Sequence, residues 1–509
     1  MTHNLSRRDF LKAAGLFSLA GLPIVHSIDR LMGEAPGVTQ PNVLIVVFDA
    51  LSAFNMSLYG YPRQTTPNIE RFARRATVFH NHYAGGNATT PGTSTLLTGT
   101  LPWTHHGCNL LGLVADAAVP YNLFGAVPGN VHTSTYTHSL IVLKLLYQFR
   151  ESLAELVLPR ELAFADLQYA DRLFMEDYNA AYAGENIILR GDDGTSSSLF
   201  LSLLFRLFAQ QHAGAIDAAN HDAFRKGVPN QDYVYFNLEN AIDWTIQQAR
   251  ALPRPFLSYY HFLPPHDPYL PRRDFTGHFV DSYEPLEKPE SFASEGFDYG
   301  QLKRNRLVYD RFIAYADAEF GRLLDALEGS GVLDNTYVIL TSDHGELFER
   351  GIRGHVTPVL YEPLVRIPLV VSAPGVRERR DVYDPTCAVD ILPTITHLYG
   401  QPPPAWSEGV ILPGFSPNPP DPQRPVFVMD SKSAPRYGPM TDGSFAVIQE
   451  GYKLIHYIRE PAEPDELYDL EKDPDELVNI VEQQPDRASQ LQRLIEQKLV
   501  EANAPYLKR

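Results

Sequence analysis

Continuous apolar runs alternate with helical patterns along most of the chain. The clearest run covers residues 42–48, where six consecutive apolar side chains follow Asn42. An uninterrupted run of this kind is typical of a strand buried on both faces, as in a parallel sheet. Comparable strands are expected at 256–262, 337–340 and 369–371, and helices at 66–73, from Thr90 onward and at 309–327. Strands that alternate with helices predict an α/β fold with a mainly parallel central sheet.

Two regions depart from this alternation. Between residues 121 and 238 the pattern loosens, and apolar-rich stretches at 138–158 and 199–208 predict a helical insertion. A proline-rich stretch at 401–425 predicts a connector. A short strand pair and a polar helix from residue 485 then predict a small α+β subdomain at 426–509. We therefore expect a main domain at 40–400, which contains the insertion, and a C-terminal subdomain.

The N-terminus carries an export pattern. Residues 6–12, Ser-Arg-Arg-Asp-Phe-Leu-Lys, closely match the twin-arginine motif. The apolar stretch at 13–25 is interrupted by Gly15, Gly21 and Pro23 and is too short for a comfortable transmembrane helix. We interpret residues 1–27 as a signal segment, with a fortuitous basic helix as the alternative. We predict that the twin-arginine translocase exports the protein to the periplasm or the extracellular space. The sequence is compatible with release of the protein and with its retention by an uncleaved signal segment.

Composition and charge restrict the partners of the protein. The 509 residues are 44% apolar and 20% charged, which is an ordinary globular mix. The 61 acidic and 43 basic residues give a net charge of −18. This balance argues against a general nucleic-acid binder, and an anionic substrate would need a local positive centre. Cys108 and Cys387 allow at most one disulfide, and we favour two small buried side chains.

Potential metal ligands follow two of the expected strands. Asp49 ends the strand at 42–48, and Asp343 and His344 follow the strand at 337–340. Ligands of open α/β sheets bind at the carboxyl ends of the strands, where such side chains converge. Two carboxylates and one imidazole predict a single divalent cation, namely Ca²⁺, Mg²⁺ or Mn²⁺, with Zn²⁺ also compatible. The alternative is that Asp49 and Asp343 only cap the helices after their strands.

Thr89 is the candidate nucleophile. It lies directly before the expected helix start at Thr90-Pro91, where free N–H groups and the helix dipole favour a tetrahedral oxyanion. A hydroxyl needs a metal or a base to become a good nucleophile, and the predicted cation would meet that need. The alternative is that Thr89 or Thr90 is only a helix cap.

Two histidines in loops are candidates for binding substrate or protonating a leaving group. His266 lies in the proline-rich segment 264–269, after the strand at 256–262. His355 lies a short distance after Asp343 and His344 in the sequence. Each imidazole can hold a substrate oxygen or supply a proton, although a lone histidine is more often structural.

Motifs in the same order resemble the sulfatase family of the alkaline phosphatase superfamily. They are PNVLIVVFD at 41–49, TPNI at 66–69, TTPG at 89–92, LLTG at 96–99, PHDPY at 265–269, the helix at 309–327, TSDHGE at 341–346, YE at 361–362, RIPL at 366–369, DILPT at 390–394, ELYDL at 466–470 and DP at 473–474. The resemblance implies an alkaline phosphatase-like sandwich, one divalent cation and attack on a sulfate or phosphate ester. By position, Asp49, Asp343 and His344 would be metal ligands, and Thr89 would be both nucleophile and ligand.

The departures from the family pattern concern the same site. Sulfatases carry a Cys or Ser in C/S-x-P-x-R, which is oxidised to formylglycine, whereas residues 89–93 are TTPGT. Oxidation of the secondary alcohol of Thr89 would give a ketone, so no formylglycine is expected, and Thr93 replaces the arginine. Ala50 replaces the second aspartate of the usual strand-end pair, and His355 stands where a lysine is expected. The first of these departures is the threonine at position 89. It resembles a subgroup of the superfamily that uses threonine as the nucleophile, which includes phosphodiesterases and phospho-group transferases.

The sequence predicts an exported, metal-dependent hydrolase that favours phosphate mono- or diesters. The alternatives are a true sulfuric ester hydrolase, a phospho-group transferase and a non-catalytic protein that keeps the fold. We expect a small or lipid-like anionic ester as substrate. The apolar residues of the insertion, such as those at 140–146 and 199–205, are interpreted as packing surfaces, with a substrate wall or a membrane contact as the alternative.

Overall fold

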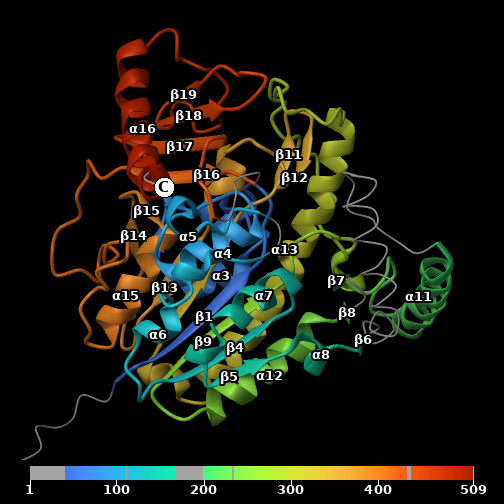
Figure 1. The fold of residues 1–509 in the computed structure, drawn as a ribbon. Coiled ribbons are helices and arrows are strands. Elements are labelled where there is room, and N and C mark those ends of the chain that lie inside the picture. The colour runs from blue at the N-terminus through green and yellow to red at the C-terminus, as the bar shows by residue number, and fades with distance from the viewer. Residues whose placement is uncertain (1–39, 110–111, 167–198, 232–233, 433–436, 508–509) are drawn as a thin grey trace, which may run out of the picture. The chain divides into compact units, whose positions relative to one another are not determined.

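An eight-stranded sheet runs through the computed structural model, which describes residues 40–109, 112–166, 199–231, 234–432 and 437–507 (Figure 1). In spatial order the strands are β14 (Arg380–Val382), β2 (Thr77–Phe79), β13 (Leu369–Ser372), β10 (Thr336–Thr341), β1 (Asn42–Phe48), β9 (Phe256–Phe262), β4 (His132–Thr137) and β5 (Glu155–Val157). The strands from β10 to β5 are parallel, and β14 is parallel to β2. Only β13 runs antiparallel, to both β10 and β2. The predicted α/β class with a mainly parallel sheet is confirmed.

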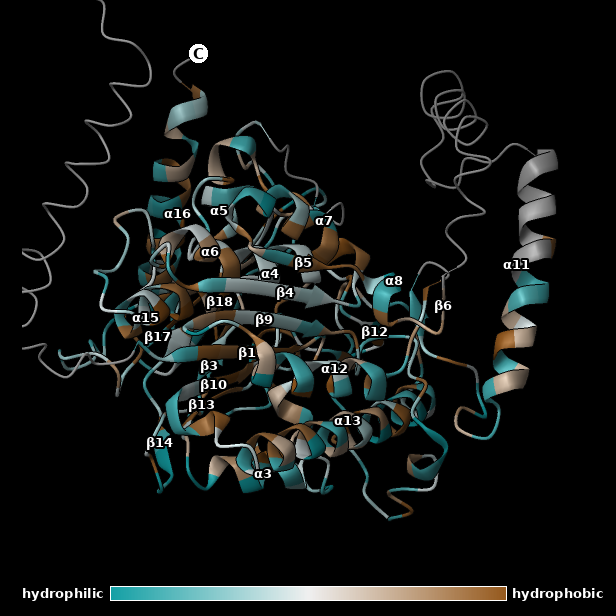
Figure 2. Cartoon of the chain, turned by 90° about the horizontal axis from the view of Figure 1, so that it is seen from below, coloured by the Kyte–Doolittle hydropathy of each residue, from teal (hydrophilic) through white to brown (hydrophobic). Residues whose placement is uncertain are grey.

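Helices cover both faces of this sheet (Figure 2). Leu44, Val46 and Phe48 of β1 pack with α3 (Pro67–Ala73), α12 (Leu238–Ala251) and α13 (Tyr299–Glu328). The alternate residues of β1 pack on the other face with α4 (Thr89–Thr98), α7 (Leu140–Gln148) and α15 (Ile391–Leu398). Each fully buried large apolar side chain contributes about 1.5–3 kcal/mol. The unbroken apolar run at 42–48 therefore reflects a strand with no solvent-exposed face.

Most expected elements occur at their predicted places. β1 and β9 have the predicted bounds, and α3 begins at Pro67 after Thr66. The helix expected at 309–327 is longer and begins at Tyr299, because Asp298 and Gln301 form a capping box at its N-terminus.

The expected insertion at 121–238 is partly wrong, since core elements lie within it. β4 pairs in parallel with β9, and β5 extends the sheet beyond β4. The sequence of β4, His-Thr-Ser-Thr-Tyr-Thr, has no apolar run, which is why it was not predicted as a strand. Outside the main sheet lie α8 (Pro159–Leu162), α11 (Leu199–Asn220) and a small sheet of β6 (Ala165–Asp166), β8 (Val234–Tyr235) and β7 (Asn230–Gln231).

The C-terminal region contains an antiparallel sheet. Its strands are β16 (Val426–Asp430), β17 (Gly443–Gln449), β18 (Tyr452–Ile458) and β19 (Glu466–Asp469), followed by α16 (Pro485–Leu507). Apolar residues of this sheet share one hydrophobic cluster with Tyr83, Trp103 and Leu360 of the main region. Buried Lys453 of β18 also forms ion pairs with Glu362, at 3.0 Å, and Glu476, at 2.8 Å. The two sheets are thus joined by apolar packing and by a buried charge network.

The described ranges also contain shorter helices and strands. They are β3 (His82–Tyr83), α5 (Pro102–His105), α6 (Leu123–Ala126), β11 (Leu347–Glu349), β12 (Ile352–Gly354), α14 (Glu362–Val365) and β15 (Thr386–Cys387). Cys108 and Cys387 are buried free thiols, as favoured from the sequence. Among the helices of the described ranges, none has the length and apolar character required to cross a bilayer. The predicted signal segment at 1–27 lies outside the described residues.

Candidate active site

The carboxyl ends of β9, β1 and β10 lie side by side. Val47 of β1 is paired with His261 on one side and with Thr341 on the other. Asp49 follows β1 directly, and Asp343 lies two residues beyond the end of β10. Parallel strands that end together bring the residues after them to one edge of the sheet. The structure therefore places the two predicted aspartates next to each other.

Asp49, His261 and Asp343 form a buried group that could hold a metal ion. One ligand atom from each residue lies within 4.8 Å of the others. His261 Nε2 is 3.0 Å from Asp49 Oδ2 and 3.8 Å from Asp343 Oδ2. Within the described ranges, Asp49 Oδ1 is buried and accepts no hydrogen bond. An orphaned carboxylate oxygen among nitrogen and oxygen donors fits a divalent cation.

His344 lies beside this cluster. Its Nδ1 lies 2.8 Å from the Gly345 carbonyl oxygen, which can only accept, so Nδ1 carries a proton. Its Nε2 lies 3.4 Å from Asp49 Oδ1 and 3.8 Å from Asp343 Oδ2. Burial alone lowers the pKa of His344, but the charges of Asp343 and Asp49 outweigh it and raise the pKa to about 9. The cluster therefore attracts positive charge strongly.

The pKa of Asp49 shows the same electrostatic balance. Complete burial raises the pKa of this carboxyl, but the nearby imidazoles of His266, His261 and His344 hold it well below its usual range. Asp49 is thus an anion inside the protein and needs a positive partner.

Thr89 lies in the first turn of α4 and faces the cluster. Its Oγ1 is 3.3 Å from His344 Nε2. The helix cap is Ala88, so Thr89 does not have the capping role that was its alternative interpretation. Gly92 holds this turn against Asp343, because a Cβ at residue 92 would lie 2.1 Å from the Asp343 carbonyl oxygen. The hydroxyl of Thr89 therefore lies at a helix N-terminus and beside the candidate metal ligands.

The two aspartates are not helix caps either. The first helical turn after Asp49 is capped by Ser52, whose side chain accepts the Phe54 N–H. Asp343 Oδ1 accepts the backbone N–H groups of Ala50 and His344, at 3.2 and 3.0 Å. These bonds tie the loop after β10 to the loop after β1 and hold both carboxylates at the cluster.

His266 and His355 gather at the entrance of the cluster. The centroid of the His355 ring lies 4.3 Å from that of His344 and 4.8 Å from that of half-buried His266. His355 Nδ1 is 3.0 Å from Glu346 Oε1, an anion that orients the ring. Burial lowers the pKa of His355, and the charge of Glu346 offsets part of that effect. All the predicted site residues thus lie in one place.

Sequence reasoning missed His261, Glu346 and Tyr259. His261 is the sixth residue of a strand that is otherwise apolar and aromatic except for Ser258, which suggests core packing. The signal available was its place near a strand end, the same one that identified Asp49. Glu346 was quoted only as part of the TSDHGE motif, and Tyr259 reads as an ordinary strand residue.

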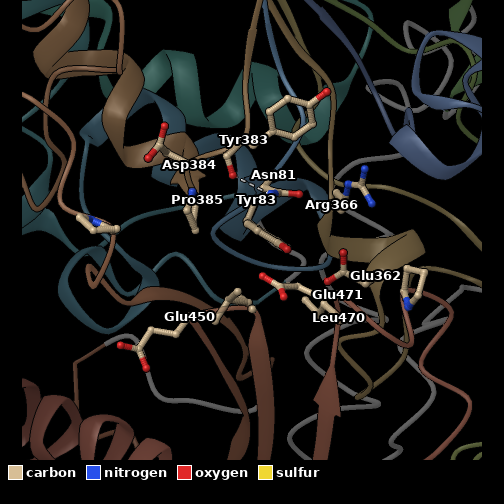
Figure 3. A pocket seen from close by; sticks show the side chains of 14 residues that line it. Asn81, Tyr83, Glu362, Arg366, Tyr383, Asp384, Pro385, Glu450, Leu470 and Glu471 are labelled. Atoms are coloured by element: carbon tan, nitrogen blue, oxygen red, sulfur yellow. Dashed lines mark hydrogen bonds between the residues drawn. The ribbon is translucent and has the colours of Figure 1, made fainter.

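A separate cavity of about 390 Å³ lies near the C-terminal sheet (Figure 3). Four carboxylates line it, from Glu362, Asp384, Glu450 and Glu471, against the single guanidinium of Arg366. Its negative charge disfavours an anionic ester. None of the candidate site residues lines it, so this cavity is separate from the candidate site at the strand ends.

Family comparison agrees with this geometry. The sulfatase family model matches residues 41–114 and 208–401, and the C-terminal model of N-sulphoglucosamine sulphohydrolase matches residues 357–504. The chain therefore belongs to the sulfatase family, with an alkaline phosphatase-like fold, and is a hydrolase of ester bonds.

Individual relatives are distant. A choline-sulfatase of Rhizobium meliloti (strain 1021) is 26% identical over 483 residues, which cover 87% of this chain and 83% of that protein. Arylsulfatase K of Gallus gallus is also 26% identical, but only 50% of this chain and 54% of that protein are covered. The structure is similar to that of a phosphonate monoester hydrolase of Agrobacterium radiobacter, with a TM-score of 0.63 and 20% sequence identity. The similarity covers 92% of this chain and 96% of that chain.

Proposed function

We propose that the protein is an exported, metal-dependent hydrolase of phosphate mono- or diesters with Thr89 as nucleophile. The observation that carries this proposal is the position of Thr89 Oγ1, at the N-terminus of α4 and 3.3 Å from His344 Nε2. Asp49, Asp343, His344 and Thr89 would hold the cation. This set, with the orphaned oxygen of Asp49, supports the metal assignment.

The bound cation would lower the pKa of the Thr89 hydroxyl and offset negative charge on the transferred group. The deprotonated oxygen of Thr89 attacks phosphorus, and the bond from phosphorus to the leaving oxygen breaks. His355 or His266 gives that oxygen a proton. A water then attacks phosphorus, its proton returns to the histidine, and the bond to Thr89 breaks. Backbone N–H groups of the first turn of α4 stabilise the charge that develops on the phosphoryl oxygens.

The identity of residue 89 favours phosphate over sulfate. Water can attack a phospho-threonine at phosphorus, whereas a sulfo-threonine lacks the elimination route that a formylglycine hydrate provides. Sulfuric ester hydrolysis is the second candidate, because the matching family model and the choline-sulfatase relative carry that chemistry in their names. Transfer to an alcohol in place of water would use the same intermediate.

Turnover of aryl phosphate, bis-aryl phosphate and aryl sulfate by the metal-replete enzyme tests this proposal. We expect phosphate turnover to exceed sulfate turnover, and Thr89→Val to lower kcat by roughly 10³-fold or more. Thr89→Ser should keep substantial activity, since its primary alcohol performs the same attack.

Thr98→Val is the matched control for the Thr89 variants. Thr98 is also a buried threonine of α4, but its hydroxyl donates to the Ser94 carbonyl oxygen at the far end of the helix. The control should keep wild-type kcat. Full activity of Thr89→Val would end the nucleophile assignment, and a preference for aryl sulfate would favour the second candidate.

Export by the twin-arginine route is part of the proposal and rests on residues 6–12. Arg7→Lys combined with Arg8→Lys should leave the protein in the cytoplasm of a host that has this translocase. Cell fractionation with an antibody to the protein measures the outcome. Unchanged export of the double variant would show that the arginine pair has no such role.

A further inference from the structure

Two departures from the family pattern lie close to His261. Ala50 lacks the second strand-end carboxylate and Thr93 lacks the guanidinium, and His261 lies near the end of β9. The N–H of Ala50 donates to Asp343 Oδ1 at 3.2 Å, and Thr93 Oγ1 donates to Asp343 Oδ2 at 3.3 Å. His261 Nε2 faces the same oxygen at 3.8 Å. The imidazole of His261 thus lies against the same carboxylate that Ala50 and Thr93 contact.

Tyr259 holds the ring of His261 in place. The Tyr259 hydroxyl oxygen lies 2.9 Å from His261 Nδ1, and both side chains are fully buried in β9. A contact at Nδ1 fixes the orientation of the ring and directs its other nitrogen, Nε2, toward the carboxylates of Asp49 and Asp343.

The nitrogen and oxygen atoms of this buried group converge on one point. His261 Nε2 lies 3.0 Å from Asp49 Oδ2 and 3.8 Å from Asp343 Oδ2, and His344 Nε2 lies 3.4 Å from Asp49 Oδ1. One ligand atom each from Asp49, His261 and Asp343 lies within 4.8 Å of the others. Around an ion with bonds of about 2.0–2.2 Å, neighbouring ligand atoms lie about 3.0–3.6 Å apart, which is close to the spacing found here. A cation held by both imidazoles satisfies the arrangement.

We propose that His261, oriented by Tyr259, takes the place of the missing carboxylate at residue 50 and makes the metal centre selective for Zn²⁺ over Mg²⁺ and Ca²⁺. This inference rests on the proposed metal site. Imidazole nitrogen is a good ligand for Zn²⁺, whereas Mg²⁺ and Ca²⁺ take oxygen ligands. A centre with two carboxylates and two imidazoles therefore shifts the preference away from the oxygen-only cations. Short Thr93, in place of an arginine, adds no positive charge that would repel the ion.

Metal affinity, measured without any activity assay, tests the proposal. Protein freed of metal by a chelator is titrated separately with Zn²⁺, Mg²⁺ and Ca²⁺ in a calorimeter. His261→Asn should weaken Zn²⁺ binding by roughly 100-fold or more and change Mg²⁺ and Ca²⁺ binding by less than about threefold. Tyr259→Phe removes the hydroxyl that orients the ring and should weaken Zn²⁺ binding by about tenfold.

His82→Asn is the matched control. His82 is also fully buried, with its Nδ1 2.9 Å from the Thr386 hydroxyl, but it lies in β3 and outside the cluster. The His82→Asn variant should lose the same kind of hydrogen bond and keep the Zn²⁺ affinity of the wild type. Pulsed electron paramagnetic resonance of the wild type loaded with Mn²⁺ gives an independent readout that needs no variant. It should show coupling to two imidazole nitrogens.

The outcomes separate this inference from the proposed function. Unchanged Zn²⁺ affinity of His261→Asn, or coupling to a single imidazole, would overturn the role of His261. If Asp343→Asn loses the metal in the same experiments, the metal site itself stands. A wild type that binds no divalent cation would overturn both.

Discussion

At the scale of the residue, a few contacts fix the orientation of the His355 ring. Its Nδ1 faces Glu346 Oε1, and its ring lies against those of His344 and His266. Glu346 is 1% exposed and has one oxygen with no hydrogen-bond partner in the described ranges. We infer that Glu346 is a positioning residue that acts through His355.

A double-mutant cycle tests this pair. His355→Asn should lower kcat/KM by roughly 10²-fold or more, since general acid catalysis contributes about that much. Glu346→Ala should lower it as well, with metal content unchanged, and the double variant should be no worse than His355→Asn alone. Losses that multiply in the double variant would show that Glu346 acts independently.

The candidate site could be predicted from the sequence only where chemistry followed a strand end directly. Asp49 stands immediately after one apolar run, and Asp343 and His344 stand shortly after another, so a sheet edge was enough to bring them together. His261 lies inside a strand, and its meeting with Asp49 depends on the register of β9 against β1. The register between two strands that are distant in the sequence cannot be predicted from the sequence of either strand alone.

At the scale of the element, one helix caps another. Thr66, at the N-cap of α3, makes no side-chain cap bond. Asp317 of α13 replaces it and accepts the backbone N–H groups of Asn68 and Ile69, at 3.0 and 2.8 Å. Asp317 is 1% exposed, so these bonds are shielded from water.

Replacing Asp317 should therefore destabilise the protein. Asp317→Ala leaves buried N–H groups without partners and should lower the free energy of unfolding by about 2–3 kcal/mol. Asp325→Ala, on the same helix, breaks an exposed ion pair with Arg71 and should cost less than about 0.5 kcal/mol. Urea titration followed by circular dichroism measures both, and equal losses would contradict the capping role.

The pH dependence of this variant has a definite sign. Burial raises the pKa of Asp317 to about 6, above its value of 3.8 in an unfolded chain. The folded protein thus binds the extra proton between about pH 4 and pH 6, and ionisation of Asp317 costs stability across that window. The wild type should lose stability relative to Asp317→Asn as the pH rises through it. A constant difference would contradict the raised pKa.

Elements with unbroken apolar runs could be predicted, but β4 could not. Its threonines and serine carry no apolar alternation, and only pairing with β9 on one side and β5 on the other makes them a central strand. Tertiary pairing overrides local pattern in such a strand. The helical interpretation of 121–238 failed for that reason.

At the scale of the whole molecule, the candidate metal site connects separate strands of the sheet. Asp49 follows β1, His261 belongs to β9, and Asp343 and His344 follow β10. A cation that binds only the folded chain stabilises all of it by mass action, by about 2.7 kcal/mol at a concentration 100 times Kd.

Metal removal should therefore lower the melting temperature together with the activity. We expect a chelator to lower Tm of the wild type and metal addition to restore it. Asp343→Asn should have a low Tm that neither treatment changes, with no bound metal by mass spectrometry of the digested protein. A metal-free wild type with unchanged Tm and full activity would contradict this prediction.

The central claim is that Thr89 carries the transferred group during turnover. The most direct measurement is mass spectrometry of the wild type quenched in acid at millisecond intervals while it hydrolyses an aryl phosphate. Fragment spectra should place one phosphoryl group on Thr89, and not on Thr90 or Thr93, and Thr89→Val should remain unmodified. Full turnover with an unmodified residue 89, or a phosphoryl group on another residue, would contradict the account.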